Sequence, residues 1–201
     1  MGTLILITGG VRSGKSRFAE QLAREIGGDR VAYVATAEAG DAEMRRKIAR
    51  HRADRPATWP TFESARDAAG AIDAAAQADP PPRAILLDCL TMLASNLLLA
   101  GDEATAAERV DRQVAALRDA CRRAPGAVLV VTNEVGWGVV PPSSLGRRYR
   151  DLLGHANQSL AADASRVYLV VAGLAVDFKS LAPTPSEVAA SLASNPPETR
   201  P

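Results

Sequence analysis

The chain has 201 residues, of which 47 % are apolar and 23 % charged, the balance of one α/β domain with a full core. Its net charge of +1 excludes a broad basic surface that would gather nucleic acid or an anionic membrane. No apolar run approaches the roughly 18 residues of a membrane span, and the two cysteines show no metal-ligand spacing, so we expect a reduced cytoplasmic protein without membrane insertion.

Runs rich in Val, Ile and Leu alternate along the chain with longer segments of helical period. The apolar runs are residues 4–8, 31–35, 84–88, 127–132 and 167–173. The helical segments are residues 14–26, 41–53, 64–78, 103–124 and 144–164. Because the apolar runs are continuous rather than alternating, we expect strands covered on both faces. The pattern predicts an α/β fold with a mostly parallel sheet and helices on both faces.

The first predicted strand leads directly into 9-GGVRSGKS-16, which matches the pattern G-x-x-x-x-G-K-[ST] in full. Gly9 and Gly14 allow backbone N–H groups to surround phosphate oxygens, Lys15 reaches the β- and γ-phosphates, and the Ser16 hydroxyl ligates Mg²⁺. The helix that begins near Gly14 adds the positive end of its dipole. The alternative is a tight glycine turn with a solvated lysine. The strand before and the helix after favour a P-loop, so the fold is expected to be P-loop NTPase-like (RecA-like).

The helix predicted over residues 41–53 places a histidine on an apolar stripe. Met44, Ile48 and His51 recur at i, i+4 and i+7, which puts them on one face. A histidine in this position is more often a buried structural residue. A neutral imidazole beside arginines can also attack an α-phosphate and form a phosphoramidate. Both interpretations remain open from these residues alone.

The third predicted strand ends at Asp88, and an acidic residue at such a strand end helps to hold Mg²⁺ in P-loop proteins. The alternative is an aspartate that caps the next helix.

After the fourth predicted strand, 133-NEVGWGVVPP-142 follows at the carboxyl edge, where open α/β sheets bind ligands. Its glycines and Trp137 form either a lid or substrate wall, or a rigid turn with a packing tryptophan.

Three classes of P-loop protein compete. A GTPase needs an N-K-x-D motif, which the chain lacks. A motor on nucleic acid needs basic, aromatic-rich loops, and a net charge of +1 with only 4 % aromatic residues disfavours this class. A small-molecule kinase or nucleotidyltransferase fits the size and charge best.

From about residue 180 the composition shifts to Pro, Ser, Thr and Ala, so we predict one domain over residues 1–179 and a mobile tail over 180–201.

Two longer strings are far more specific than the P-loop: 51-HRADRPATW-59, of the form H-R-x-x-R-P-x-x-W, and 132-TNEVGWGVVP-141, of the form T-N-E-V-G-x-G-x-V-P. With these strings, the sequence closely resembles the bifunctional adenosylcobinamide kinase/adenosylcobinamide-phosphate guanylyltransferases of cobalamin biosynthesis, over nearly all of the chain before the tail. The resemblance implies phosphorylation of adenosylcobinamide by ATP or GTP. It also implies transfer of GMP from GTP to adenosylcobinamide phosphate through a guanylylated histidine, with release of pyrophosphate.

The resemblance also implies roles for individual residues. His51 matches the guanylylated histidine, and His51 and Lys15 are the expected catalytic residues. The expected nucleotide contacts are Gly9, Gly10, Val11, Arg12, Ser13, Gly14, Lys15, Ser16, Val34, Ala35, Thr36, Arg52, Ala53, Asp54, Arg55, Glu63 and Asp88. Ser16 and Asp88 are the expected Mg²⁺ ligands, and Asp88 stands where some relatives carry a glutamate. A homo-oligomer is implied as well.

Two other functions stay open. Another small-molecule P-loop kinase would transfer only a γ-phosphoryl group and form no covalent nucleotide intermediate, with His51 structural. A nucleotide-regulated binding module would bind GTP without turnover. The general base of the kinase step is not fixed by the sequence, since Asp88 and Glu63 both qualify and Glu63 also suits guanine binding.

Overall fold

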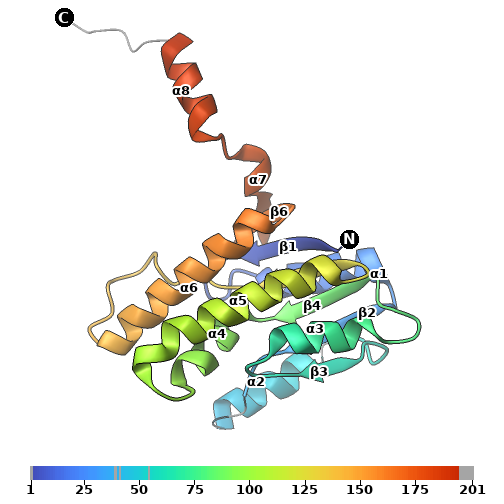
Figure 1. Cartoon of the computed structure of the whole chain (residues 1–201). Helices are drawn as coiled ribbons and strands as arrows, with labels where there is room; N and C mark the ends of the chain where they lie inside the picture. Colours follow the sequence, from blue (N-terminus) through green and yellow to red (C-terminus); the bar gives the residue numbers. More distant parts are fainter. Residues whose placement is uncertain (1, 39, 41, 54, 195–201) are drawn as a thin grey trace, which may run out of the picture.

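The computed structural model describes residues 2–38, 40, 42–53 and 55–194, and shows a seven-stranded sheet with helices on both faces (Figure 1). The strands are β1 (Thr3–Thr8), β2 (Val31–Ala35), β3 (Thr61–Glu63), β4 (Ala84–Asp88), β5 (Ala127–Val131), β6 (Arg166–Val171) and β7 (Leu174–Asp177). The helices are α1 (Lys15–Gly27), α2 (Ala42–Ala53), α3 (Ala68–Ala76), α4 (Leu90–Leu99), α5 (Ala106–Arg123), α6 (Ser144–Asp163), α7 (Phe178–Leu181) and α8 (Pro185–Ser194), with a 3₁₀ turn at Glu103–Thr105.

The strands are ordered β3-β2-β4-β5-β1-β6-β7. The first six in this order are parallel, and β7 pairs antiparallel to β6. All five apolar runs of the sequence form strands, which confirms the predicted mostly parallel sheet. Because the central strands are parallel, the carboxyl ends of β2, β4, β5 and β1 meet at one edge of the sheet.

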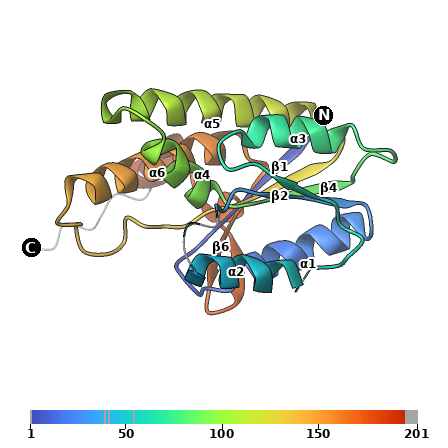
Figure 2. The same ribbon diagram turned by 90° about the horizontal axis from the view of Figure 1, so that it is seen from below.

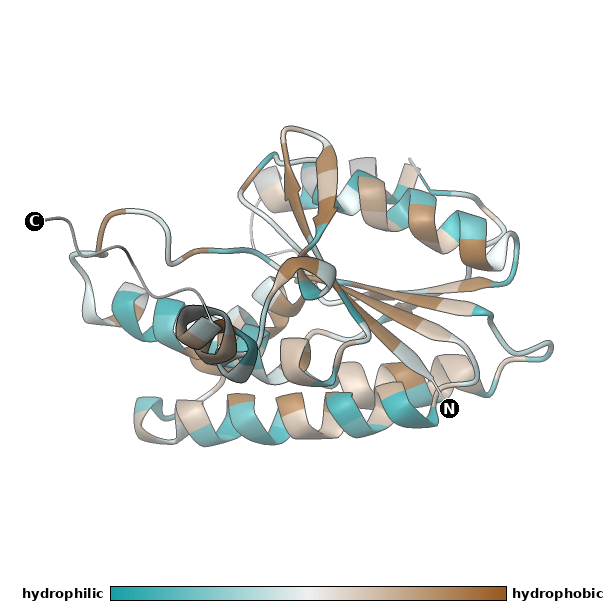
Figure 3. Cartoon of the chain, turned by 90° about the horizontal axis from the view of Figure 1, so that it is seen from above, coloured by the Kyte–Doolittle hydropathy of each residue, from teal (hydrophilic) through white to brown (hydrophobic). Residues whose placement is uncertain are grey.

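Both faces of the sheet are covered. Figure 2 shows α1 and α2 on one side and α3 to α6 on the other. Along β1, Leu4 and Leu6 are buried in the core under α3 to α6, whereas Ile5 and Ile7 are buried in the core under α1. Figure 3 shows the apolar strands between helices that carry polar residues. Burial on both faces explains why the strands read as continuous apolar runs.

Several elements differ from the sequence-based expectation. Helix α4 was not predicted, because LTMLASNLLL is apolar on nearly all sides and shows no polar face. The short strands β3 and β7 were also not predicted. Helix α3 begins at Ala68 rather than at residue 64, because Oδ1 of Asp67 accepts a hydrogen bond from the N–H of Gly70 at 2.9 Å and caps the helix there.

Helices α7 and α8 follow the last strand, and α8 extends away from the sheet in Figure 1. The side chains described in α8 are exposed. The domain boundary at residue 179 and the mobility of residues 180–201 stay predictions. Among the described residues, no helix is both long and apolar enough to cross a bilayer.

Candidate active site

The P-loop joins the end of β1 to the start of α1. Gly14 is the N-cap of α1 and has a φ of 95°, a conformation that favours glycine. The N–H of Ser13 donates to the carbonyl oxygen of Gly10 at 3.2 Å, and Nζ of Lys15 donates to the same oxygen at 3.1 Å. The predicted strand–loop–helix context of the motif is therefore confirmed.

The turn between β6 and β7 packs directly against the P-loop. Ala172 and Gly173 have φ values of 52° and 82°, as a two-residue hairpin turn requires. The N–H of Gly173 donates to the carbonyl oxygen of Ser13 at 2.8 Å. A Cβ atom at Gly14 would lie 3.1 Å from Cα of Gly173, and one at Gly9 would collide with the carbonyl oxygen of Val170. The two glycines of the motif are thus required by packing as well as by phosphate access.

A cavity of about 440 Å³ borders the P-loop beside this turn. It is lined by Arg12, Ser13, Gly14, Arg17, Phe18, Gln21 and Gly173. Arg12 is exposed and has a φ of 60°. The hydroxyl of Ser13 is buried and has no hydrogen-bond partner among the described residues.

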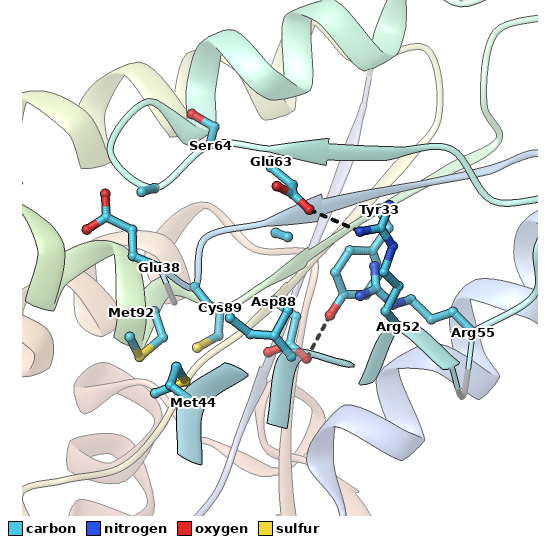
Figure 4. A pocket seen from close by; sticks show the side chains of 14 residues that line it. Tyr33, Glu38, Met44, Arg52, Arg55, Glu63, Ser64, Asp88, Cys89 and Met92 are labelled. Atoms are coloured by element: carbon cyan, nitrogen blue, oxygen red, sulfur yellow. Dashed lines mark hydrogen bonds and ion pairs between the residues drawn. The ribbon is translucent and has the colours of Figure 1, made fainter. Parts of the chain in front are cut away.

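A larger cavity, of about 540 Å³, lies where the ends of β2 and β4 meet α2 (Figure 4). Its lining residues are Tyr33, Ala35, Ala37, Glu38, Met44, Ile48, Arg52, Arg55, Glu63, Ser64, Ala65, Asp88, Cys89 and Met92. Five of them are predicted site residues: Ala35, Arg52, Arg55, Glu63 and Asp88. Met44 and Ile48, which the sequence placed on the stripe of His51, also line it. We call this space the main cavity.

Tyr33 lies at the centre of a polar arrangement in the main cavity. Its phenol donates to Oδ2 of Asp88 at 3.1 Å, and the guanidinium of Arg55 lies 3.6 Å from the centroid of its ring. Burial raises the pKa of Tyr33 well above its usual value, and the negative charge of Asp88 raises it further. The phenol therefore stays protonated and serves as a hydrogen-bond donor to Asp88.

Arg52 and Glu63 form an ion pair at the main cavity, at 3.8 Å, which Figure 4 shows as a dashed line. Both side chains are about 70 % exposed. An exposed pair of this length contributes little to stability, so a charged ligand can replace either partner at small cost.

Cys89 lines the main cavity with its thiol in the neutral form. Burial raises its pKa to about 12, and the neighbouring Asp88 acts in the same direction. The positive charge of Lys15 acts on the pKa of the same thiol in the opposite sense. A protonated thiol is a poor nucleophile, which leaves Cys89 as a wall residue.

Two predicted contact residues, Val34 and Thr36, have buried side chains. Val34 is fully buried in the core. Thr36 is also buried, and its hydroxyl donates to the carbonyl oxygen of Cys89 at 2.7 Å and accepts from the N–H of Cys89 at 2.8 Å. Nδ2 of Asn96 donates to the carbonyl oxygens of Thr36 and Ala65, at 2.8 and 2.9 Å. Thr36 and Asn96 thus hold the loops around the cavity, a role for Asn96 that the sequence analysis missed.

Part of the predicted site lies outside the residues and side chains that the structure describes. Asp54 lies outside the described residues. His51 belongs to α2, but its side chain is not among those described, and Ala53 is the last residue of that helix. Val11 is 82 % exposed on the P-loop.

The donor set predicted for Mg²⁺ is one hydroxyl and one carboxylate. Ser16 lies in the first turn of α1, and Asp88 ends β4, two strands from the P-loop strand. No cluster of three or more His, Cys, Asp or Glu side chains occurs among the described residues. Few protein oxygens together with substrate phosphates suit Mg²⁺, which retains several waters. Ser16 and Asp88 therefore fit a nucleotide-bound Mg²⁺, although no side chain but Tyr33 contacts Asp88 in the hydrogen bonds described.

A second polar group lies at the end of β5, within the string 132–141 that the sequence analysis singled out without assigning a role to Thr132 or Glu134. Glu134 accepts hydrogen bonds at Oε1 from the hydroxyl of Thr8, at 2.8 Å, and from Nδ2 of Asn157, at 3.4 Å. The buried hydroxyl of Thr132 donates to Oδ1 of Asn157 at 2.7 Å. The signal was present in the sequence as the polar triplet Thr132 to Glu134 directly after a buried apolar strand.

Comparison with known proteins gives consistent results. A family model described as cobinamide kinase / cobinamide phosphate guanyltransferase matches residues 5–178. The bifunctional adenosylcobalamin biosynthesis protein CobP of Pseudomonas aeruginosa is 47 % identical over 174 residues, which cover 87 % of this chain and 96 % of that protein. The protein CobU of Salmonella typhimurium is 43 % identical over 186 residues, covering 88 % and 99 % of the two chains.

Among solved structures, the chain is similar to an ATPase from the type III secretion system of pathogenic bacteria. The TM-score is 0.56 at 15 % identity, with 95 % of this chain and 61 % of that chain covered. It is also similar to the ATPase domain of G40P, with a TM-score of 0.50 at 17 % identity and coverage of 83 % and 68 %. At such identities the likeness concerns the fold alone, which is the predicted P-loop NTPase-like α/β fold.

Proposed function

The chain belongs to the cobinamide kinase / cobinamide phosphate guanyltransferase family, and on this premise we propose that it catalyses two successive reactions of adenosylcobalamin biosynthesis. ATP or GTP first phosphorylates the aminopropanol hydroxyl of adenosylcobinamide. GMP from GTP is then joined to adenosylcobinamide phosphate, giving adenosyl-GDP-cobinamide and pyrophosphate. The observation that carries this proposal is the main cavity, where α2, two arginines and three carboxylates meet at the same carboxyl edge of the sheet as the P-loop.

We assign the nucleophile of guanylyl transfer to His51. Helix α2 lines the main cavity with Met44 and Ile48, and position 51 follows these residues by seven and three positions, on the same helical stripe. An imidazole nitrogen attacks the α-phosphorus of GTP, so that an N–P bond forms and the bond to the α,β-bridging oxygen breaks. Pyrophosphate leaves with that electron pair, and an oxygen of adenosylcobinamide phosphate then displaces the imidazole.

The charged groups of the site match the charges of this reaction. The P-loop N–H groups and Lys15 hold the departing pyrophosphate, and the guanidinium groups of Arg52 and Arg55 stabilise charge on the α-phosphate. Mg²⁺, held by Ser16 and Asp88 with the phosphates, would neutralise charge on the nucleotide.

The walls of the main cavity suit a guanine base. Met44, Ile48 and Met92 supply apolar contact, and Glu63 supplies a carboxylate at the same cavity. A carboxylate can accept both hydrogen bonds that the N1–H and the exocyclic amine of guanine donate, whereas adenine offers no such pair of donors. Glu63 is therefore proposed to select GTP, after release from its exposed pair with Arg52.

We assign binding of the corrinoid ring to the segment that follows β5. Trp137, Val139 and Val140 are 71 %, 95 % and 58 % exposed, an unusual run of apolar surface for one loop. This loop leaves the carboxyl edge of the sheet beside the P-loop, where the acceptor must approach. The prediction of a homo-oligomer is independent of this assignment and stays untested.

The proposal is tested with GTP labelled at the α-phosphate. After incubation and denaturation, wild-type protein is expected to carry an acid-labile, base-stable label, and His51→Asn is expected to carry none. The matched control is His155→Asn, because His155 is 70 % exposed on α6 and lies 3.9 Å from Asp111, away from the cavity residues. This control should retain the label.

The outcomes also separate the other functions. Phosphorylation of adenosylcobinamide without any adduct would favour a kinase that uses no covalent intermediate. Binding of GTP without turnover of either kind would favour a nucleotide-regulated binding module.

A further inference from the structure

Glu134 is a carboxylate that the proposed reactions do not yet use. It lies three residues beyond β5, and its N–H donates to the carbonyl oxygen of Gly9, the first residue of the P-loop motif, at 3.4 Å. Thr8, which holds the Glu134 side chain, directly precedes that glycine. Backbone and side chain therefore both fix Glu134 to the start of the P-loop.

The strand order puts this carboxylate between two parts of the phosphate site. Strand β5 lies between β1, which leads into the P-loop, and β4, which ends at Asp88. Val131 is the register partner of both Ile7 and Asp88. The segment that continues from Val131 to Glu134 thus emerges between the phosphate-binding loop and the proposed Mg²⁺ carboxylate.

The two oxygens of Glu134 have different surroundings. Oε1 accepts from Thr8 and Asn157, and Asn157 is 7 % exposed and held in turn by Thr132. Oε2 accepts no hydrogen bond from the described residues, and none of these residues forms an ion pair with Glu134. Neutral donors orient this half-buried carboxylate without neutralising its charge, so Oε2 remains available to a donor from a ligand.

We propose that Glu134 is the catalytic base of the kinase step and accepts the proton of the acceptor hydroxyl. The inference rests on the proposed function. The hydroxyl oxygen attacks the γ-phosphorus, and an O–P bond forms while the bond from the γ-phosphorus to the β,γ-bridging oxygen breaks. The electron pair of that bond leaves on the nucleoside diphosphate. The hydroxyl proton moves to Oε2 of Glu134 and then to water, so charge and atoms balance.

The placement of Glu134 also fits the proposed acceptor surface. Trp137 follows three residues later on the exposed loop assigned to the corrinoid ring. An acceptor lying on that loop would bring its hydroxyl to the end of β5. Asp88 is less suited to this role because it is engaged by Tyr33 and proposed to hold Mg²⁺, and Glu63 lines the main cavity with Arg52.

The test compares Glu134→Gln with wild type, with ATP as the phosphoryl donor and adenosylcobinamide as the acceptor. The amide oxygen of glutamine can still accept from Thr8, but it cannot take a proton. The kcat of the kinase step is expected to fall at least 100-fold, with little change in the KM for adenosylcobinamide. Formation of the GMP adduct from α-labelled GTP should stay within about twofold of wild type, because that step does not use the acceptor hydroxyl.

A second variant separates catalysis from support of the loop. Thr8→Val removes one donor to Oε1 and leaves the carboxylate, so a catalytic Glu134 predicts a much smaller loss of kinase activity than in Glu134→Gln. Equal losses in the two variants, or parallel loss of kinase activity and adduct in Glu134→Gln, would show a supporting role and overturn the proposal. Retention of more than a tenth of the kinase kcat in Glu134→Gln would overturn it as well. A wild-type protein without kinase activity would overturn the proposed function and this inference together, whereas an active wild type with an active Glu134→Gln overturns the inference alone.

Discussion

The phenol of Tyr33 donates a hydrogen bond to Oδ2 of Asp88 at 3.1 Å, while the guanidinium of Arg55 lies over the ring of the same tyrosine, 3.6 Å from its centroid. One buried side chain thus orients both a carboxylate proposed to hold Mg²⁺ and a cation proposed to contact phosphate. The arrangement couples two parts of the site that come from β4 and from the chain after α2.

Removal of the Tyr33 hydroxyl should weaken the use of Mg²⁺. In Tyr33→Phe, Asp88 loses its donor but the ring under Arg55 is kept. The Mg²⁺ concentration for half-maximal GMP-adduct formation is expected to rise about three- to tenfold, the effect of about 1 kcal/mol, with a nearly unchanged rate at saturating Mg²⁺. Tyr149→Phe is the matched control, because its phenol donates to the carbonyl oxygen of Thr91 on α4 at 3.1 Å. An unchanged Mg²⁺ titration in Tyr33→Phe would contradict the coupling.

The thiol of Cys89 should resist alkylation although it lines a cavity. With its pKa raised to about 12, only about 10⁻⁴ of the thiol is ionised at pH 8, and the thiolate is the reactive form. Cys121 is buried with its pKa also raised to about 12. Mass spectrometry after iodoacetamide at pH 8 is expected to find both cysteines unmodified in the native protein and both modified in denaturant. Rapid modification of Cys89 in the folded protein would show that the thiol is ionised.

Asp163 should make the free energy of unfolding depend on pH in the acid range. Its hydrogen bonds to Arg118, at 2.7 and 2.9 Å, hold the pKa of the carboxyl below its usual value. A carboxyl with a lowered folded-state pKa stabilises the fold above the unfolded-state value of about 3.9, and this contribution is lost as the pH falls through the folded-state value. Asp163→Asn is therefore expected to lower the free energy of unfolding by about 1 kcal/mol at pH 7.

The difference between wild type and Asp163→Asn should vanish in acid, below the folded-state pKa of Asp163. Urea unfolding at pH 7 and at decreasing pH measures this difference. A difference that stayed constant across the acid range would mean that the ion pairs of Asp163 with Arg118 and Arg122 do not carry the effect.

Two glycine substitutions should change the free energy of unfolding in opposite directions. Gly14→Ala imposes a side chain on a φ of 95° and brings Cβ to 3.1 Å from Gly173, so it is expected to destabilise the protein by about 1–3 kcal/mol and to weaken GTP binding at least tenfold. In Gly154→Ala, the new Cβ meets no atom within 4 Å in the middle of α6, and stability should rise by about 0.5–1 kcal/mol. Thermal unfolding and GTP titration measure both. A tolerated Gly14→Ala with normal GTP affinity would contradict the packing argument.

Corrinoid binding should be visible through one tryptophan. The chain has two, and Trp59 is 5 % exposed with Nε1 donating to the carbonyl oxygen of Gly28 at 3.1 Å. In Trp59→Phe only Trp137 emits, and its fluorescence is expected to be quenched by adenosylcobinamide. In Trp137→Phe the emission of Trp59 should change much less. Equal responses in the two variants would place the acceptor elsewhere, and a change of oligomeric state in Trp137→Phe would point to a second copy of the chain on this loop.

The sequence predicted those parts of the fold whose burial or flanking elements leave a recognisable local pattern of residues. The five long strands are apolar on both sides and were found as continuous runs, and the P-loop was found because its strand and helix flank it. Helix α4 was missed because burial on nearly all sides removes the periodicity that marks a surface helix. The short β3 and β7 were missed because three or four residues carry too little pattern.

Candidate site residues divide in a similar way. Arg52, Arg55 and Asp88 line the main cavity, whereas Val34 and Thr36 have buried side chains, and the nucleotide contacts that the family resemblance implies for all of them stay predictions. Tyr33 was not singled out, because within a strand it reads as a core residue. Its second role depends on Asp88, which is 55 positions away in sequence but hydrogen-bonded across the sheet. Such pairs follow from strand order, which no local pattern contains.

The contact between Gly173 and Ser13 has a consequence for how the protein is made. The hairpin turn that holds the backbone of the phosphate-binding motif is synthesised more than 150 residues after the motif itself. A nascent or truncated chain that ends before that turn contains the entire motif and lacks the contact that shapes it. The ability to bind a triphosphate should therefore arise only after that turn has been synthesised.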